Sequence, residues 1–179
     1  MDSDDEALAL AAADGDRVAF SALLGRHYDR LFGLAFRLTG RRAEAEDLTH
    51  DICLALPAKL AGFRGQARFT TWLYRVVVNA AHDRRRRAAT RARAATGWGD
   101  WELNRQAAMA EQRDAVDWLT EAMRALPEEL RDTAALVLDG EMTQAQAAEV
   151  LGIAAGTLAW RMSEVKKRLR ALHEKEQGA

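Results

Sequence analysis

Apolar residues recur every three or four positions along most of the chain, which is the period of an α-helix with one buried side. The clearest case lies near the C-terminus, where Leu158, Met162, Val165, Leu169 and Leu172 follow at spacings of 4, 3, 4 and 3 residues. Polar and cationic residues fill the positions between them. This pattern predicts a helix over 158–172 with a buried stripe and a polar outer face.

The same period predicts further helices at 4–13, 17–39, 43–60, 72–87, 115–126, 127–140 and 143–152. Asp14 or Asp16 is expected to cap the second of these, and Gly40 to end it. Pro57 is expected to kink or end the third, because proline cannot donate the helical hydrogen bond. The β-branched run Val76–Val78 is typical of a strand, but no second strand is predicted to pair with it.

The helical period is lost between residues 88 and 110, where Gly97-Trp98-Gly99 makes a poor helix interior. We interpret this stretch as a linker between domains. The expected fold is therefore all-α, with two small helical domains over 1–87 and 115–179 joined by a flexible linker over 88–114.

Composition supports a helical protein of a reducing compartment. The chain has 179 residues, of which 49% are hydrophobic and only two are proline. Its single cysteine, Cys53, excludes an internal disulfide. The acidic N-terminus does not resemble a signal peptide, and no apolar run is long enough to cross a membrane. We expect a cytoplasmic protein without membrane insertion.

The net charge of −1 conceals a strong asymmetry. Residues 1–16 carry six acidic side chains and no basic ones, whereas residues 64–93 carry nine arginines and the single acid Asp83. The segment from Arg161 onward is also mostly basic. Two cationic segments on a nearly neutral chain predict two surfaces that contact phosphate.

The second cationic segment follows a local helix-turn-helix pattern. Thr143 and Gln146 form a capping-box sequence, and Gly152 is placed to stop that helix before a longer one begins. A short helix, a glycine turn and a helix with a cationic outer face are typical of a motif that enters a DNA groove. The alternative is an ordinary helical hairpin with a solvated face. The candidate duplex-binding residues are Thr143, Thr157, Trp160, Arg161, Ser163, Glu164 and Lys167.

The first cationic segment combines arginines with glycines and aromatic residues, which is typical of a surface for unpaired DNA. Exposed aromatic rings stack on bases for about 1–3 kcal/mol each, while arginines hold the backbone. Thr70 or Thr71 is expected to cap the helix that follows. The alternative is that the aromatic residues, Trp72 above all, belong to the core. The candidate residues are Phe63, Arg64, Gly65, Arg68, Phe69, Trp72, Arg75, Asn79 and Arg84.

The sequence has no catalytic constellation. Its four histidines are scattered, and the pair His50 and Cys53 supplies too few ligands for a zinc site. No glycine-rich phosphate loop follows a strand. We expect no enzymatic activity, no small-molecule substrate, no cofactor and no metal.

These segments resemble a known family. The stretch 63–83 resembles the second conserved region of extracytoplasmic-function (group IV) sigma factors of the sigma-70 family, and 43–51 is similar to the polymerase-binding helix of that family. The stretches 125–131 and 142–157 resemble its fourth region. The resemblance covers about 17–87 and 115–172, in the family's order.

The resemblance implies a transcription initiation factor that binds core RNA polymerase at the largest-subunit clamp and at the flap. Promoter DNA would be read at the −10 box as a melted strand with an extruded base, and at the −35 box through the helix-turn-helix. An anti-sigma factor is the expected regulator. The implied polymerase-binding residues are Glu44, Asp47, Leu48, His50 and Asp51.

The chain departs from the family pattern on both surfaces. Cys53 and Pro57 stand where Phe and Trp are usual, and Ala159, Trp160 and Glu164 stand where a basic residue, a serine and a basic residue are common. We therefore predict an atypical −35 box, with Thr157 and Lys167 on the phosphates. Two alternatives are a helix-turn-helix regulator that acts without polymerase and a sigma-like protein-interaction module.

Overall fold

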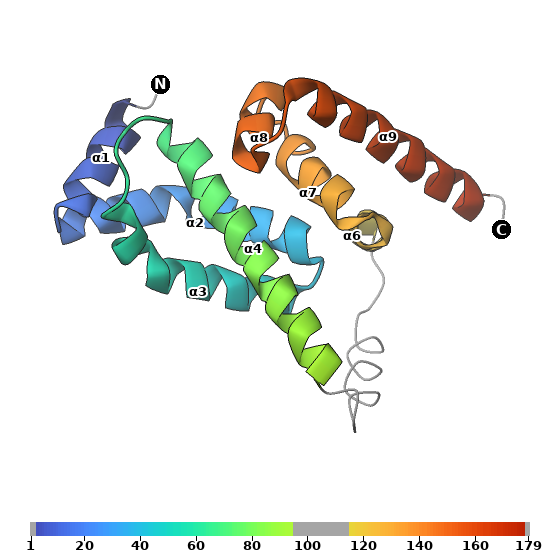
Figure 1. Ribbon diagram of the computed structural model, residues 1–179, viewed down its shortest axis with the longest axis horizontal. Helices are drawn as coiled ribbons and strands as arrows, with labels where there is room; N and C mark the ends of the chain where they lie inside the picture. The colour runs from blue at the N-terminus through green and yellow to red at the C-terminus, as the bar shows by residue number, and fades with distance from the viewer. Residues whose placement is uncertain (1–2, 95–114, 178–179) are drawn as a thin grey trace.

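The computed structural model describes residues 3–94 and 115–177, and every regular element in these stretches is an α-helix. The helices are α1 (Ser3–Ala13), α2 (Arg17–Thr39), α3 (Arg42–Leu60), α4 (Phe69–Ala94), α6 (Ala115–Ala125), α7 (Glu128–Val137), α8 (Gln144–Leu151) and α9 (Ala155–Gln177). They form two bundles, α1–α4 and α6–α9 (Figure 1). The prediction of an all-α fold is confirmed, and residues 76–78 are helical.

In the first bundle, α2 is the central helix and packs against α1, α3 and α4. Its stripe of apolar residues, with Leu31 and Leu34 fully buried, faces Ile52 and Leu56 of α3 and Leu73 of α4. The three-to-four-residue spacing in each helix brings these side chains onto one face. Burial of this shared core fixes the positions of the loop before α4 and of the outer face of α3.

The ends of α2 and α3 follow local rules. The Asp16 carboxylate accepts hydrogen bonds from the backbone N–H groups of Val18 and Ala19 at 2.8 and 3.1 Å, and Gly40 ends α2 in the left-handed conformation at φ 70°. The helix α3 continues through Pro57 to its end at Leu60, so the proline does not end it at its own position. Burial of the Leu60 side chain holds this last turn in place.

The start of α4 differs from the prediction. The helix begins at Phe69 rather than at Trp72, and the Phe69 N–H donates to the Glu6 carboxylate of α1 at 2.8 Å. A carboxylate from a distant helix therefore supplies the cap that Thr70 or Thr71 was expected to provide. At its other end α4 runs to Ala94, so the first part of the expected linker is helical. The rest of that linker, with Trp98, lies outside the described residues.

The helix α1 is held on α2 by a partly buried ionic cluster. Asp5, whose side chain is buried, accepts hydrogen bonds from Arg26 at 2.9 Å and pairs with Nε2 of the buried His27 at 2.8 Å. Asp4 binds the other side of Arg26 at 2.6 Å. Burial raises the pKa of Asp5, but the hydrogen bonds of Arg26 and His27 outweigh it and leave that pKa below its usual value.

This cluster makes the docking of α1 sensitive to acid. Because the pKa of Asp5 is lowered by folding, its stabilising contribution is present above the ordinary value of 3.8 and is lost as pH falls below it. We expect Asp5→Asn to lower the free energy of unfolding at pH 6, and the difference from wild type to shrink at pH 3. Urea unfolding at both pH values measures this. A difference that is the same at both pH values would contradict it.

In the second bundle the predicted helix-turn-helix is confirmed. The Thr143 hydroxyl accepts from the Gln146 N–H at 3.2 Å, the Gln146 side chain accepts from the Thr143 N–H at 2.9 Å, and Gly152 ends α8 at φ 65°. The predicted stripe of α9 faces α7 and α8, with Leu158 and Val165 fully buried. The opposite face of α9 is left toward solvent.

The two bundles are in contact. The helix α2 packs against α6 and α7, and α8 lies beside the N-terminal half of α4 (Figure 1). A single cluster of buried apolar residues extends through both bundles. The structure is therefore a closed arrangement, in which part of the first cationic segment faces the second bundle rather than solvent.

Candidate nucleic-acid interface

The loop before α4 does not present its phenylalanines to solvent. Phe63 and Phe69 are only 4% and 1% exposed. Their rings meet edge to face with centroids 5.9 Å apart, and both contact the partly buried Trp72 at 5.4 and 5.7 Å. The expectation that these phenylalanines are exposed stacking platforms is wrong for this structure. The loop folds back on α1 and α2, where the two rings bury apolar surface that solvent would otherwise cover.

The solvent side of the loop is cationic instead. Arg64 and Arg68 are exposed, and Gly65 adopts a left-handed conformation at φ 64°, which glycine reaches without strain. The aromatic cluster beneath them forms a rigid base. The arrangement offers two guanidinium groups and an open stretch of backbone to an anionic strand.

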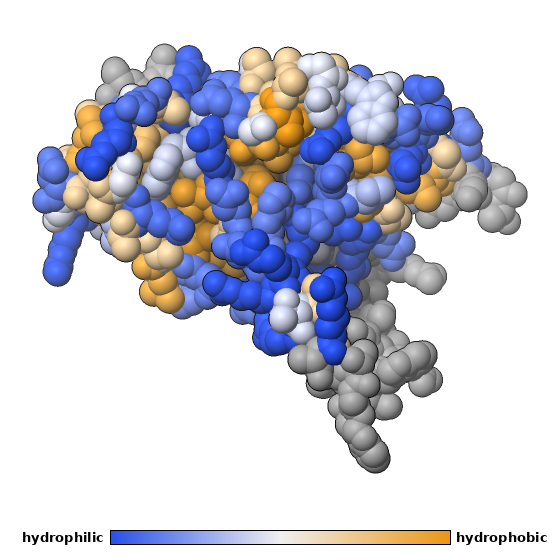
Figure 2. Space-filling model, viewed as in Figure 1, coloured by the Kyte–Doolittle hydropathy of each residue, from blue (hydrophilic) through white to orange (hydrophobic). Residues whose placement is uncertain are grey.

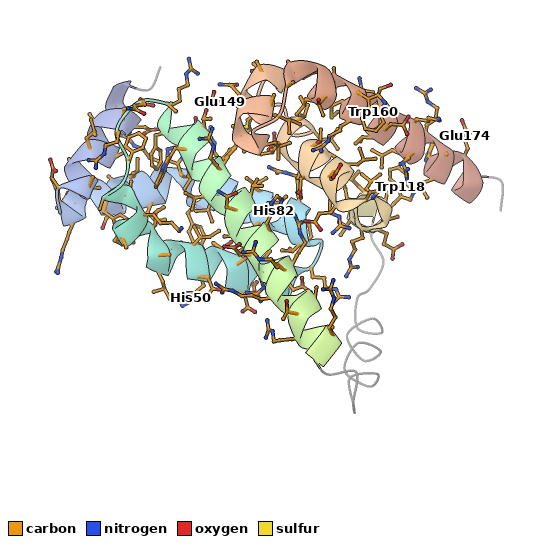
Figure 3. All side chains as sticks on the ribbon, in the orientation of Figure 1. His50, His82, Trp118, Glu149, Trp160 and Glu174 are labelled. Carbon is orange, nitrogen blue, oxygen red and sulfur yellow. The ribbon has the colours of Figure 1, made fainter. Side chains whose placement is uncertain are left out.

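The next candidates lie on α4, and the second bundle contacts one of them, Arg75, whose side chain stays partly exposed. The Arg75 guanidinium donates to the backbone carbonyl of Glu149 at 2.9 Å and lies 3.8 Å from its carboxylate. Glu149 projects from α8 toward α4 (Figure 3). Asn79, one turn further on, is exposed. In this arrangement Arg75 is occupied by protein, while Asn79 remains accessible.

Arg84 connects the two predicted sites of the first bundle. Its guanidinium binds Asp47 at 2.9 Å and Asp51 at 3.3 Å, both on the outer face of α3. Hydrophilic side chains gather over the C-terminal half of α4 (Figure 2). A candidate DNA-binding cation and two candidate polymerase-binding acids therefore neutralise each other across adjacent helices.

Four of the five residues expected to bind polymerase have side chains at least partly exposed on the outer face of α3. Asp47, His50 and Asp51 are exposed, and His50 lies on the side away from α4 (Figure 3). Glu44 is half-buried and pairs with Arg41 at 3.2 Å. Leu48, however, is only 2% exposed. Its selection as a contact residue is wrong, because it belongs to the buried stripe of α3.

On α9, the outer face carries most of the predicted duplex-binding residues. Thr157, Ser163 and Lys167 are exposed, and the Trp160 side chain is 62% exposed (Figure 3). The opposite face of α9 is fully packed, so an indole this exposed does not contribute to the core. Thr143 is exposed but uses its hydroxyl and N–H in the capping box.

Two further predicted residues of α9 have partners within the bundle. The Arg161 side chain is only 16% exposed and binds Glu129 of α7 at 3.0 Å, so it holds α9 against α7 rather than facing outward. Glu164 lies 3.9 Å from Lys167 and 4.0 Å from Arg168 on its own helix. Its negative charge is therefore partly screened by two neighbouring cations.

The contact between the bundles is strongly polarised. The first bundle supplies arginines, a histidine and a phenol, and the second supplies acids. The pairs are Arg30 with Glu141 at 3.1 Å, Arg37 with Asp139, Tyr74 with Glu141 at 2.6 Å, His82 with Asp132 at 2.7 Å, and Arg85 with Asp132 and Glu128 at 3.0 Å each. Burial and then the Glu141 hydrogen bond raise the pKa of Tyr74, so its hydroxyl remains a donor at neutral pH.

Sequence reasoning missed these contacts. The paired residues are 43 to 111 positions apart, so no spacing rule within one helix connects them. The available signal was the excess of arginine in one half and of acids at 128, 129, 132, 139 and 141 in the other. Opposite charge on two domains indicates that they attract each other, but not which residues meet.

One group in the described residues has the composition of a metal site. His82, Glu128 and Asp132 place a ligand atom each within 4.8 Å of one another. The Arg85 guanidinium already binds both carboxylates, so a cation occupies the position that a metal would take.

Cys53 is half-buried, and burial raises the pKa of its thiol. No helix among residues 3–94 and 115–177 combines the length and apolar character needed to span a membrane.

Comparisons with known proteins cover both bundles. Residues 23–91 match the family described as Sigma-70 region 2. The chain is 37% identical over 171 residues to the ECF RNA polymerase sigma factor SigM of Mycobacterium tuberculosis, covering 95% of this chain and 84% of that protein. It is 24% identical over 176 residues to the ECF RNA polymerase sigma factor SigW of Bacillus subtilis, covering 87% and 89%.

Two solved structures share the whole fold. CnrH in complex with the cytosolic domain of CnrY superposes with a TM-score of 0.71 at 26% identity, covering 96% of this chain and 97% of that one. The sigma factor RpoE in complex with the anti-sigma factor NepR from Bartonella quintana has a TM-score of 0.71 at 22% identity, covering 87% and 96%. These coverages include both bundles.

Proposed function

Because this chain belongs to the extracytoplasmic-function (ECF) RNA polymerase sigma factors, we propose that it directs core RNA polymerase to promoters through two DNA-binding surfaces, one on each bundle. The observation that carries the proposal is the exposed outer face of α9, which continues a complete helix-turn-helix in a chain similar to sigma factors over nearly its whole length. We propose that the chain does no covalent chemistry itself.

The upstream surface is the outer face of α9. Thr157 and Lys167 contact phosphates, while Trp160 and Ser163 reach base edges or methyl groups in the major groove. Arg161 keeps the helix in position through Glu129. Glu164 accepts a hydrogen bond from a cytosine, which its two cationic neighbours permit by screening it from phosphate.

The downstream surface is the loop before α4 with the exposed side of that helix. Base extrusion costs a few kcal/mol, which contacts to the displaced strand must offset. Arg64 and Arg68 supply the charge and Asn79 supplies a hydrogen-bonding group. The buried phenylalanines hold the loop in shape, and Trp72 at their edge is the remaining aromatic candidate for stacking.

The outer face of α3 is proposed as the polymerase contact, through Glu44, Asp47, His50 and Asp51. Two of these acids are engaged by Arg84 within the first bundle. Polymerase and promoter binding therefore compete with contacts within the protein. Opening the closed arrangement frees Arg75 of the first bundle from Glu149 of the second.

We propose that an anti-sigma factor controls the chain by stabilising the closed arrangement. The structure of RpoE that shares this fold is a complex with an anti-sigma factor, and the arrangement here engages Arg75, on one of the two proposed DNA-binding surfaces, in a hydrogen bond to Glu149. A ligand shifts a conformational equilibrium by the difference between its affinities for the two states. The anti-sigma factor therefore needs only to bind the closed arrangement more tightly than the open one.

In vitro transcription tests the proposed function. Purified core polymerase with this chain is expected to initiate from a subset of promoters in a genomic library, and core polymerase alone from none of them. Replacing both Asp47 and Asp51 with Asn should reduce transcription while leaving duplex binding by the isolated chain intact. A chain that binds promoter DNA but never supports initiation would be a regulator that acts without polymerase.

The recognition helix gives a separate prediction. Trp160→Ala should weaken binding to a −35 duplex about tenfold, the loss expected for about one good base contact. Because the indole is exposed, the free energy of unfolding should change by no more than about 0.5 kcal/mol. Fluorescence anisotropy measures the affinity. Leu138→Ala, an exposed apolar residue of the same bundle, is the control and should leave DNA binding unchanged.

A further inference from the structure

The helix α1 lies along the loop that joins α3 to α4, residues 61–68 (Figure 1). Two successive turns of α1 contact this segment, because Glu6 and Leu10 are four positions apart and share one face of the helix. The Glu6 carboxylate accepts the hydrogen bond from the Phe69 N–H, where the loop ends. One turn later, a Cβ placed on Gly65 would lie 4.0 Å from Cδ1 of Leu10, which is ordinary van der Waals contact. The helix therefore forms one wall of the proposed downstream DNA-binding surface.

Leu10 is an apolar side chain that the fold leaves accessible at this wall. It is 44% exposed, whereas Ala9, on the face of α1 that packs into the bundle, is fully buried. Beyond the chain neighbours of Gly65, no other described atom comes within 4 Å of the point where a Cβ would stand. Glycine allows a ligand to approach the backbone closely. The space over Gly65 is therefore open, with an alkyl group at its edge.

The cations beside this space are not occupied by the protein. Arg64 precedes Gly65 and Arg68 follows it; both are exposed, and neither has an acidic partner among the described residues. The Arg75 guanidinium on α4, in contrast, is held by α8. A phosphate backbone can bind the two loop guanidinium groups without displacing a contact of the protein. A nucleotide held there by its phosphates has its base within reach of Leu10.

We propose that Leu10 of α1 packs against the base that is extruded from the −10 box, so that α1 is part of the reading site. This inference rests on the proposed function, because it concerns the same downstream surface. A base that leaves the duplex stack needs a new apolar surface, and the buried Phe63 and Phe69 do not supply it. Leu10 supplies such a surface, while Arg64 and Arg68 hold the strand.

Binding of single strands to core polymerase assembled with this chain tests the contact. The probes are non-template −10 strands of promoters found by transcription in vitro, with each base replaced in turn by an abasic site, and fluorescence anisotropy gives the affinity. The position at which an abasic site weakens wild-type binding most is that of the extruded base. Leu10→Ala should weaken binding to the intact strand about fivefold, because it removes most of the alkyl contact. On the strand that lacks this base, Leu10→Ala and wild type should bind equally, since the contact is already lost.

Three further variants separate this contact from folding. Leu10→Met keeps an apolar side chain of similar size and should bind the intact strand like wild type. Leu10→Gln keeps a similar helix propensity but presents a polar amide, and should bind like Leu10→Ala. Val18→Ala, which shortens an apolar side chain of α2 that is 80% exposed, is the matched control and should leave binding unchanged.

Two results would overturn the inference. One is equal binding of Leu10→Ala and wild type to the intact strand. The other is a loss for Leu10→Ala that persists on the abasic strand, because Leu10 would then support the loop without touching the base. If wild type supports initiation from no promoter, the proposed function itself fails. Initiation by wild type together with either of the first two results removes only the role of Leu10.

Discussion

Replacing Phe69 with alanine is expected to lower the free energy of unfolding by about 3–5 kcal/mol, the range for deleting a buried phenylalanine ring. The side chain is 1% exposed and meets Phe63, Trp72 and His27, whose ring lies edge-on at 5.3 Å. The cavity would open between α1, α2 and the loop, so the loss includes contacts that cannot re-form. Urea unfolding followed by circular dichroism measures it.

The control is Tyr28→Ala, an aromatic residue of the same bundle with 47% of its surface exposed, for which a loss below about 1 kcal/mol is expected. The Phe69 variant should also lose strand separation at the promoter, because the loop that carries Arg64 and Arg68 rests on this ring. A Phe69→Ala protein as stable as the Tyr28 variant would show that the ring is not part of the core in solution.

Replacing Asp132 with alanine is expected to open the closed arrangement. Asp132 is 3% exposed and binds both His82 and Arg85 across the contact between bundles. Removing one partner of a buried pair costs about 3–5 kcal/mol, and we reduce this to about 1–3 kcal/mol because the His82 and Arg85 side chains are partly exposed to solvent. Small-angle scattering should show a larger radius of gyration, and the affinity for promoter DNA should rise.

Glu128→Ala is the matched control for this experiment. Glu128 binds the same guanidinium at the same distance of 3.0 Å, but its side chain is 54% exposed. The exposed pair should contribute about 0–1 kcal/mol, so the closed arrangement should persist. If the two variants open the protein to the same extent, burial of Asp132 does not hold the bundles together.

The second bundle was predictable from sequence because its determinants are local. The capping box of Thr143 and Gln146, the stop at Gly152 and the stripe from Leu158 to Val165 each involve residues within a few positions of one another. Local rules of capping and periodicity decide such a segment before tertiary contacts act. The exposure of Trp160 follows from its position opposite that stripe.

The first site was only partly predictable, because its determinants are distant in sequence. Aromatic residues near arginines and glycines indicate a stacking surface, yet burial of Phe63 and Phe69 depends on α1 packing over the loop. Arg161 and Lys167 are both cations of α9, but only the first has an acid of another helix within reach. Composition gives the charge of a surface, and tertiary packing decides which charges remain available.

The capping of α4 by Glu6 links the two ends of the first bundle and has a consequence for synthesis of the chain. The helix α1 leaves the ribosome before α4 but cannot complete its contacts until residue 69 has also emerged. Fusion partners placed ahead of α1 should therefore disturb the loop before α4, more than sixty positions away. Expression tags for this protein belong at the other end.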